Sequence, residues 1–177
     1  LIGLVGSEMC IRDRTTPVLW RGPIIAGTVK QFYSDIIWGD IDYMFIDCPP
    51  GTGDVPLTIF QSIPIDGVVV VTTPQDLVSV IVGKAVHMAD SMNIPVIGMI
   101  ENMSYFICPD CNNKHYIFGK SQLEQVIRDL YIGHAIRLPI NPSLAGFMDR
   151  GEIEHMEANA DLQEFADLIS TFDPDKY

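Results

Sequence analysis

Positive charge is scarce in this chain, and its scarcity argues against one class of function. The 177 residues include 11 Lys plus Arg against 23 Asp plus Glu, which gives a net charge of −12. Such a chain has no general electrostatic attraction to phosphate backbones or to anionic lipids. We therefore expect no nucleic-acid partner and no membrane partner.

Long hydrophobic runs are also missing. The longest, at residues 67–71 and 94–100, fall far short of the roughly 20 residues that span a bilayer. No positively charged segment precedes the apolar residues 1–6, so the sequence predicts no export signal. These observations predict a soluble, cytoplasmic protein.

Cysteine is sparse, with only Cys10, Cys48, Cys108 and Cys111 in the whole chain. Four cysteines in a chain of this length are too few for the disulfide framework of a small secreted protein. Two of them form a Cys-x-x-Cys pair, which favours metal or redox chemistry in a reducing cytoplasm. Cys10 is assigned no role.

Apolar residues are abundant by comparison. Hydrophobic residues make up 47% of the chain, charged residues 19%, and the mean hydropathy is +0.21, which favours one core with strands buried on both faces. Strand-like runs alternate with helical patterns, so we expect a doubly wound, mainly parallel α/β sheet. Strands are expected at residues 41–47, 66–73, 94–101 and 134–138, and helices at 22–39, 77–92, 121–131 and 160–172.

The end of the first expected strand has the composition of a phosphate site. Asp47 closes the strand, and a loop rich in Gly and Pro follows at residues 48–54. An Asp there can hold Mg²⁺ through water while the amides of Gly51 and Gly53 approach a terminal phosphate. An ordinary turn into a helix, with Asp54 as its N-cap, explains the same residues equally well.

Asn102 follows another expected strand. Its amide donor and carbonyl acceptor can pair with the edge of a nucleobase. An Asn in this position is more often simply a turn former.

The pair Cys108 and Cys111 lacks the helical context of a thioredoxin-like redox motif, which favours a metal. The pair supplies two ligands, and the sequence has no second Cys-x-x-Cys. Two copies meeting on a two-fold axis would supply four thiolates to a shared iron–sulfur cluster or zinc. A site within one chain would recruit His115 and remain one ligand short. Two inert neighbouring thiols are the remaining alternative.

Several sequence blocks occur in a characteristic order. They are WRGP at 20–23, WGDIDY at 38–43, DCPPGTGD at 47–54, TTPQD at 72–76, ENMSYFICPDC at 101–111 and IFG at 117–119. Together they closely resemble the Mrp/ApbC family of ATP-binding iron–sulfur cluster carriers, which are relatives of the MinD and nitrogenase iron-protein ATPases. The resemblance extends from about Thr15 to at least Gly151.

The resemblance implies a P-loop NTPase-like fold and a homodimer. Each subunit would bind ATP and Mg²⁺, and the two would hold a labile [4Fe–4S] cluster between them for delivery to apo-proteins. Cys108 and Cys111 match the cluster-ligating pair, and Asp47 matches the catalytic acid that ends the Walker B strand. The remaining candidate nucleotide-binding residues are Gly51, Thr52, Gly53 and Asp54 of the switch loop and the adenine-side Asn102.

One departure from the family is severe. Its members have a Gly-rich P-loop with an additional lysine and a first switch acid, both upstream of the matching region, and the printed sequence has neither. The P-loop supplies the amide cradle, the phosphate-binding lysine and the Mg²⁺-binding hydroxyl. We therefore expect that this chain by itself neither holds ATP tightly nor hydrolyses it.

The same departure predicts how the chain is organised. Residues 1–14 do not match the family and are interpreted as a junction sequence, followed at 15–177 by the C-terminal part of a single Mrp-like ATPase domain. The fold is therefore expected to be truncated at the N-terminus. A missing P-loop strand would open the sheet between residues 41–47 and 66–73 and expose strand edges.

Two functions fit these observations. The leading interpretation is a carrier that transfers a [4Fe–4S] cluster to apo-proteins in an ATP-dependent cycle. The alternative is a structural zinc-binding dimerisation module without ATPase activity. A partition-type ATPase that binds membranes or DNA is disfavoured by the acidic charge.

Overall fold

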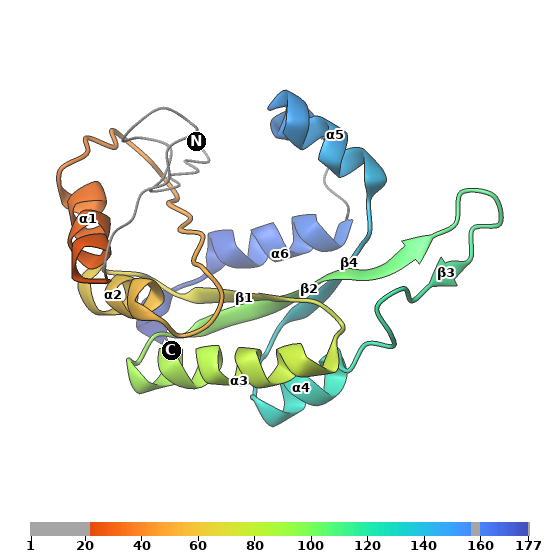
Figure 1. The fold of residues 1–177 in the computed structure, drawn as a ribbon, viewed down its shortest axis with the longest axis horizontal. Helices are drawn as coiled ribbons and strands as arrows, with labels where there is room; N and C mark the ends of the chain where they lie inside the picture. The colour runs from red at the N-terminus through yellow and green to blue at the C-terminus, as the bar shows by residue number, and fades with distance from the viewer. Residues whose placement is uncertain (1–21, 157–159, 177) are drawn as a thin grey trace. The chain divides into compact units, whose positions relative to one another are not determined.

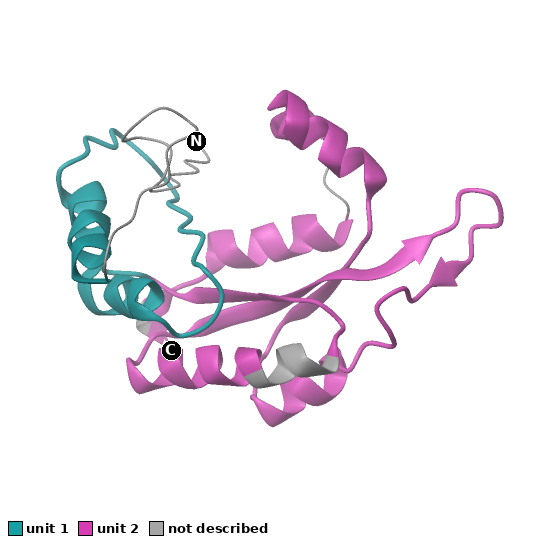
Figure 2. Ribbon diagram, in the orientation of Figure 1, with its two compact units in different colours: residues 1–65 teal, residues 66–177 magenta. Residues whose placement is uncertain are grey.

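The computed structural model describes residues 22–156 and 160–176 and divides into two compact units, residues 1–65 and 66–177 (Figure 2). The interpretation of residues 1–14 lies outside the described residues, as do Trp20 and Arg21 of the first sequence block.

The first unit contains helices α1 (Gly22–Ser34) and α2 (Asp54–Ser62), which pack against each other. The close approach explains a glycine at the start of α1, since a Cβ at Gly22 would collide with the Asp54 carboxylate. The expected helix at 22–39 ends earlier than predicted, at Ser34. Gly39 then turns the chain with a φ of +71°, in the left-handed region that glycine adopts without strain.

The prediction of a strand at residues 41–47 is wrong. These residues form no strand, and their apolar side chains are exposed, including Tyr43 at 51% and Phe45 at 60%. A strand needs a neighbour to bond its backbone N–H and C=O groups, and no described residue pairs with this segment. The apolar pattern therefore predicts that these residues suit a buried position. They form no strand because no described strand pairs with them.

The second unit is built on a mainly parallel sheet, as predicted (Figure 1). Its strands are β1 (Val68–Thr72), β2 (Val96–Ile107), β3 (Lys114–His115) and β4 (Ala135–Pro139). Strand β2 is central and pairs in parallel with β1 and β4. Strand β3 pairs antiparallel with the C-terminal end of β2. Among the described residues β1 pairs only with β2, and Val71 on it is 62% exposed.

Helices cover both faces of this sheet, which confirms the doubly wound arrangement (Figure 1). On one face lie α3 (Asp76–Ser91) and α4 (Leu123–Asp129), and Val82 and Val86 of α3 share a buried core with Met99 of β2. On the other lies α6 (Ala160–Thr171), whose Phe165 ring lies 2.8 Å from the position that a Cβ on Gly98 would take. Alternate residues of β2 thus face opposite layers.

The sequence interpretation did not include helix α5 (Pro142–Arg150). Its start has a standard signal, because the Asn141 side chain accepts a hydrogen bond from the Ser143 N–H and Pro142 is the first helical residue. Short 3₁₀ helices follow at η1 (Ile153–His155) and η2 (Pro174–Lys176). None of the described helices has the length and apolar character needed to cross a membrane.

Candidate metal-binding hairpin and nucleotide-site residues

The Cys-x-x-Cys pair lies at the tip of a hairpin formed by β2 and β3, which projects from the end of the sheet (Figure 1). Phe106 pairs with His115 and Ile107 with Lys114. The turn is closed by two backbone hydrogen bonds: the Cys108 N–H donates to the Asn113 carbonyl at 3.0 Å, and the Asn112 N–H donates to the Cys108 carbonyl at 2.9 Å. Both cysteines therefore belong to a closed, hydrogen-bonded turn.

Three metal-ligating groups converge at this tip. The Sγ atoms of Cys108 and Cys111 and one ring nitrogen of His115 all lie within 4.8 Å of one another. Cys108 is half-buried, whereas Cys111 and His115 are exposed. Thiolate and imidazole ligands are the donor set that zinc, iron and related transition metals prefer.

The turn also favours the metal-binding form of one cysteine. The backbone N–H groups of Cys111 and then Asp110, followed by the Cys111 thiol, donate hydrogen bonds that lower the pKa of Cys108. Thiolates rather than thiols bind metals, so the turn favours the ligating form of Cys108. In the first unit, by contrast, burial and then the charge of Asp47 raise the pKa of Cys48.

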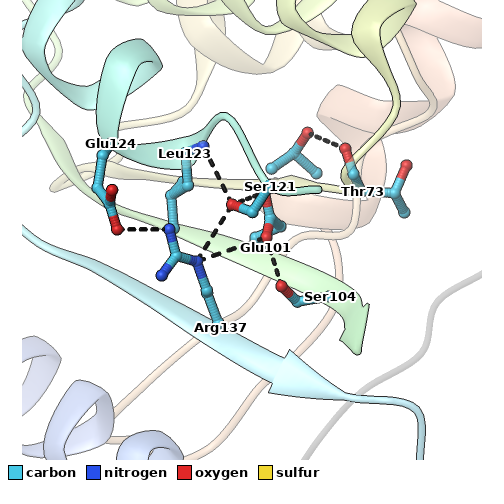
Figure 3. A network of polar contacts seen from close by, with 8 residues as sticks. Thr73, Glu101, Ser104, Ser121, Leu123, Glu124 and Arg137 are labelled. Atoms are coloured by element: carbon cyan, nitrogen blue, oxygen red, sulfur yellow. Dashed lines mark hydrogen bonds and ion pairs between the residues drawn. The ribbon is translucent and has the colours of Figure 1, made fainter. Parts of the chain in front are cut away.

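A buried polar network lies at the base of the hairpin (Figure 3). Glu101 is 3% exposed and accepts hydrogen bonds from the hydroxyls of Ser104 at 2.5 Å and Ser121 at 2.9 Å. Arg137 donates to Ser121 at 3.1 Å, lies 3.7 Å from Glu101, and forms an ion pair with Glu124 at 2.7 Å. This network joins β2, β4 and the start of α4.

The network lies where β2 changes its pairing register, between Glu101 and Tyr105. Met103, inside this irregularity, has a φ of +55°. Beyond it, the Lys114 ammonium lies 4.2 Å from the centre of the Tyr105 ring and braces the two hairpin strands. The sequence interpretation gave Glu101 no role, although an acid within an apolar strand signals a buried, paired carboxylate.

The nucleotide candidates are divided between the two units. Asp47 is exposed in the extended segment of the first unit rather than at a strand end. Gly51 has a φ of +89°, Thr52 is exposed, and Gly53 is the N-cap of α2. Asp54 is therefore not the N-cap but the first residue of α2, and no side chain caps this helix.

Asn102 lies in the second unit and is half-buried. Its side-chain oxygen accepts a hydrogen bond from the Met103 N–H at 2.9 Å. That local contact is the one expected of a turn former, and it leaves the side-chain amide as a donor.

Parallel strands between two helical layers define the second unit as an α/β fold, and its hairpin carries a candidate metal-binding tip. The family model described as "ParA: NUBPL iron-transfer P-loop NTPase" matches residues 2–172, and the chain belongs to this family. The predicted fold class and the resemblance to iron–sulfur cluster carriers are thereby confirmed.

Individual relatives agree with this family. The chain is 48% identical over 140 residues to the iron-sulfur cluster carrier protein of Methanocaldococcus jannaschii, covering 78% of this chain and 48% of the relative. It is 44% identical over 137 residues to that of Aquifex aeolicus, covering 77% and 38%. The chain spans about half the length, or less, of the curated relatives it matches.

A solved structure is also similar. It is a nucleotide-binding protein from Archaeoglobus fulgidus in complex with ADP, in which cobalt was found. The TM-score is 0.70 at 40% identity, and the match covers 76% of this chain and 56% of that one. About three quarters of this chain, 76%, therefore resembles part of a nucleotide-binding protein.

Proposed function

We propose that this chain acts as part of an iron–sulfur cluster carrier in which Cys108 and Cys111 of two copies hold a [4Fe–4S] cluster and pass it to apo-proteins. The observation that carries this proposal is the placement of both cysteines on one projecting hairpin tip. Two such tips supply four thiolates, which is the usual ligand set of a [4Fe–4S] cluster. The named function of the relatives supports the same conclusion.

The exposure of the tip favours transfer over permanent storage. Cys111 is exposed and Cys108 only half-buried, so thiolates of a recipient protein can approach the cluster. A structural site is instead expected to be closed. The cytosolic assembly factor of Schizosaccharomyces japonicus, 38% identical over 163 residues, supports a cytosolic place for this chemistry.

We further propose that, in a protein that also carries the P-loop, residues of the first unit contribute to binding ATP and Mg²⁺. Asp47 would serve as the catalytic acid, and its exposed carboxylate has the oxygen donors that Mg²⁺ prefers. The switch-loop candidates are Gly51, Thr52, Gly53 and Asp54. They precede or begin α2, and a helix start without a side-chain cap suits a phosphate. In the second unit, taken by itself, Asn102 is the candidate donor to an adenine.

The iron, acid-labile sulfide and zinc contents of the anaerobically reconstituted chain test the cluster proposal. We expect about two iron and two sulfide per chain, lost in the Cys108→Ser/Cys111→Ser variant. The matched control is Cys48→Ser, which removes a thiol of the first unit and should retain the cluster. Zinc at about half an atom per chain, without sulfide, would favour the structural module instead.

A further inference from the structure

His115 is a ligand-type residue at the hairpin tip that the proposed cluster does not use. It lies on β3, directly opposite Phe106 of β2, and is exposed. One of its ring nitrogens lies within 4.8 Å of both Cys108 Sγ and Cys111 Sγ. All three groups come from one chain, so their convergence requires no second copy.

The hairpin holds this set together before any metal arrives. Strand pairing fixes the position of His115 relative to β2, and the two backbone hydrogen bonds around Cys108 close the turn between them. The fold has therefore already brought the three ligands together, and metal binding loses little further chain entropy. Side-chain rotation is the remaining adjustment.

The spacing is close to that of a tetrahedral ion. Bonds of about 2.3 Å to sulfur and about 2.0 Å to nitrogen place neighbouring ligand atoms about 3.5–3.8 Å apart. The three ligand atoms lie within 4.8 Å of one another, so each pair closes by no more than about 1.3 Å, which side-chain rotation supplies.

Two sulfur ligands and one imidazole nitrogen determine which metal ions the site prefers. This donor set suits Zn²⁺, Co²⁺ and Fe²⁺, whereas Mg²⁺ and Ca²⁺ prefer oxygen ligands. Three protein ligands leave the fourth position of a tetrahedron open, which separates the site from a closed structural zinc site. At an exposed tip that position is accessible to water or to an incoming thiolate.

We propose that the hairpin of a single chain binds one thiophilic divalent ion through Cys108, Cys111 and His115, with its fourth position open. The site uses the cysteines of the cluster proposal but does not depend on it, since it needs neither sulfide nor a second copy.

Anaerobic titration of the metal-free 177-residue chain with Co²⁺ tests this site. We expect saturation at one Co²⁺ per chain, with the strong visible absorption of four-coordinate thiolate-bound cobalt and no cobalt-dependent change of oligomeric state in sedimentation. In His115→Ala the affinity for Co²⁺ should fall about tenfold or more, and the absorption bands should shift. The control His134→Ala, an exposed histidine outside the hairpin, should bind as the parent does.

A second measurement uses the unaltered protein. X-ray absorption of the zinc-loaded chain should report two sulfur ligands, with nitrogen or oxygen ligands completing the shell. Four sulfur ligands, saturation at half an ion per chain with dimer formation, or unchanged Co²⁺ binding by His115→Ala would each overturn the proposal. Reconstitution of the parent chain with iron and sulfide, run in parallel, reports on the cluster separately, so the two proposals can fail independently.

Discussion

At the scale of single residues, the cysteines differ in how readily they ionise. Backbone N–H groups lower the pKa of Cys108, whereas burial raises the pKa of Cys48. A lowered thiol pKa means that the thiolate persists to lower pH, and the thiolate is the reactive form. Cys108 should therefore be alkylated by iodoacetamide faster than Cys48 at neutral pH, and its rate should reach half-maximum at a lower pH. Peptide mass spectrometry follows both, and equal or reversed rates would contradict the assignment.

Arg137 is the second prediction at this scale. Arg137→Met would leave the buried Glu101 carboxylate with hydroxyl donors alone, and we expect a loss of about 1–2 kcal/mol in the free energy of unfolding. The comparison is Glu124→Gln, which changes the exposed partner of the same arginine and should cost less than about 0.5 kcal/mol. Urea denaturation measures both, and equal losses would show that the buried carboxylate does not depend on Arg137.

At the scale of elements, Gly98 lies where strand β2 meets helix α6. A Cβ there would lie 2.8 Å from the Phe165 ring and 2.9 Å from the His134 carbonyl, which is backbone and cannot rotate away. Gly98→Ala should therefore lower the free energy of unfolding by about 1–3 kcal/mol. Gly83 in α3 has open space around its missing Cβ, so Gly83→Ala should instead stabilise the protein by about 0.5–1 kcal/mol. A loss in both variants on denaturation would refute the packing argument.

The elements also show what the sequence can and cannot reveal. Four consecutive Val residues marked β1, and helical spacing marked α3, because these signals are local. The segment 41–47 was expected to be a strand because it is apolar, but pairing depends on a neighbour that no local pattern encodes. Strand β2 extends to Ile107, beyond the predicted end at residue 101, since β3 pairs with its last residues.

The candidate site, too, could be predicted only in part from the sequence. Cys-x-x-Cys spacing alone predicted a metal-binding turn. The sequence also named His115 as the residue that a site within one chain would recruit, and the register of β3 places it opposite Phe106, within 4.8 Å of both sulfurs. The contact of Ser121 with Glu101 links residues 20 positions apart, so it was not evident from spacing.

At the scale of the whole molecule, the printed sequence offers candidate nucleotide-binding residues and a complete cysteine pair. The printed sequence contains no Gly-rich, lysine-containing P-loop. Without that amide cradle and lysine, the 177-residue chain should hydrolyse ATP at no more than the background rate. Phosphate release measures this rate, and activity above background that Asp47→Ala abolishes would contradict the prediction.

The central claim is that two copies of this chain share one cluster through four cysteine thiolates. Native mass spectrometry of the anaerobically reconstituted chain tests it most directly, because one mass reports the number of chains and the cluster content together. The account predicts a dimer with four iron and four sulfide, absent from the Cys108→Ser/Cys111→Ser variant. A cluster carried by a single chain, or a dimer that forms with zinc and no sulfide, would contradict it.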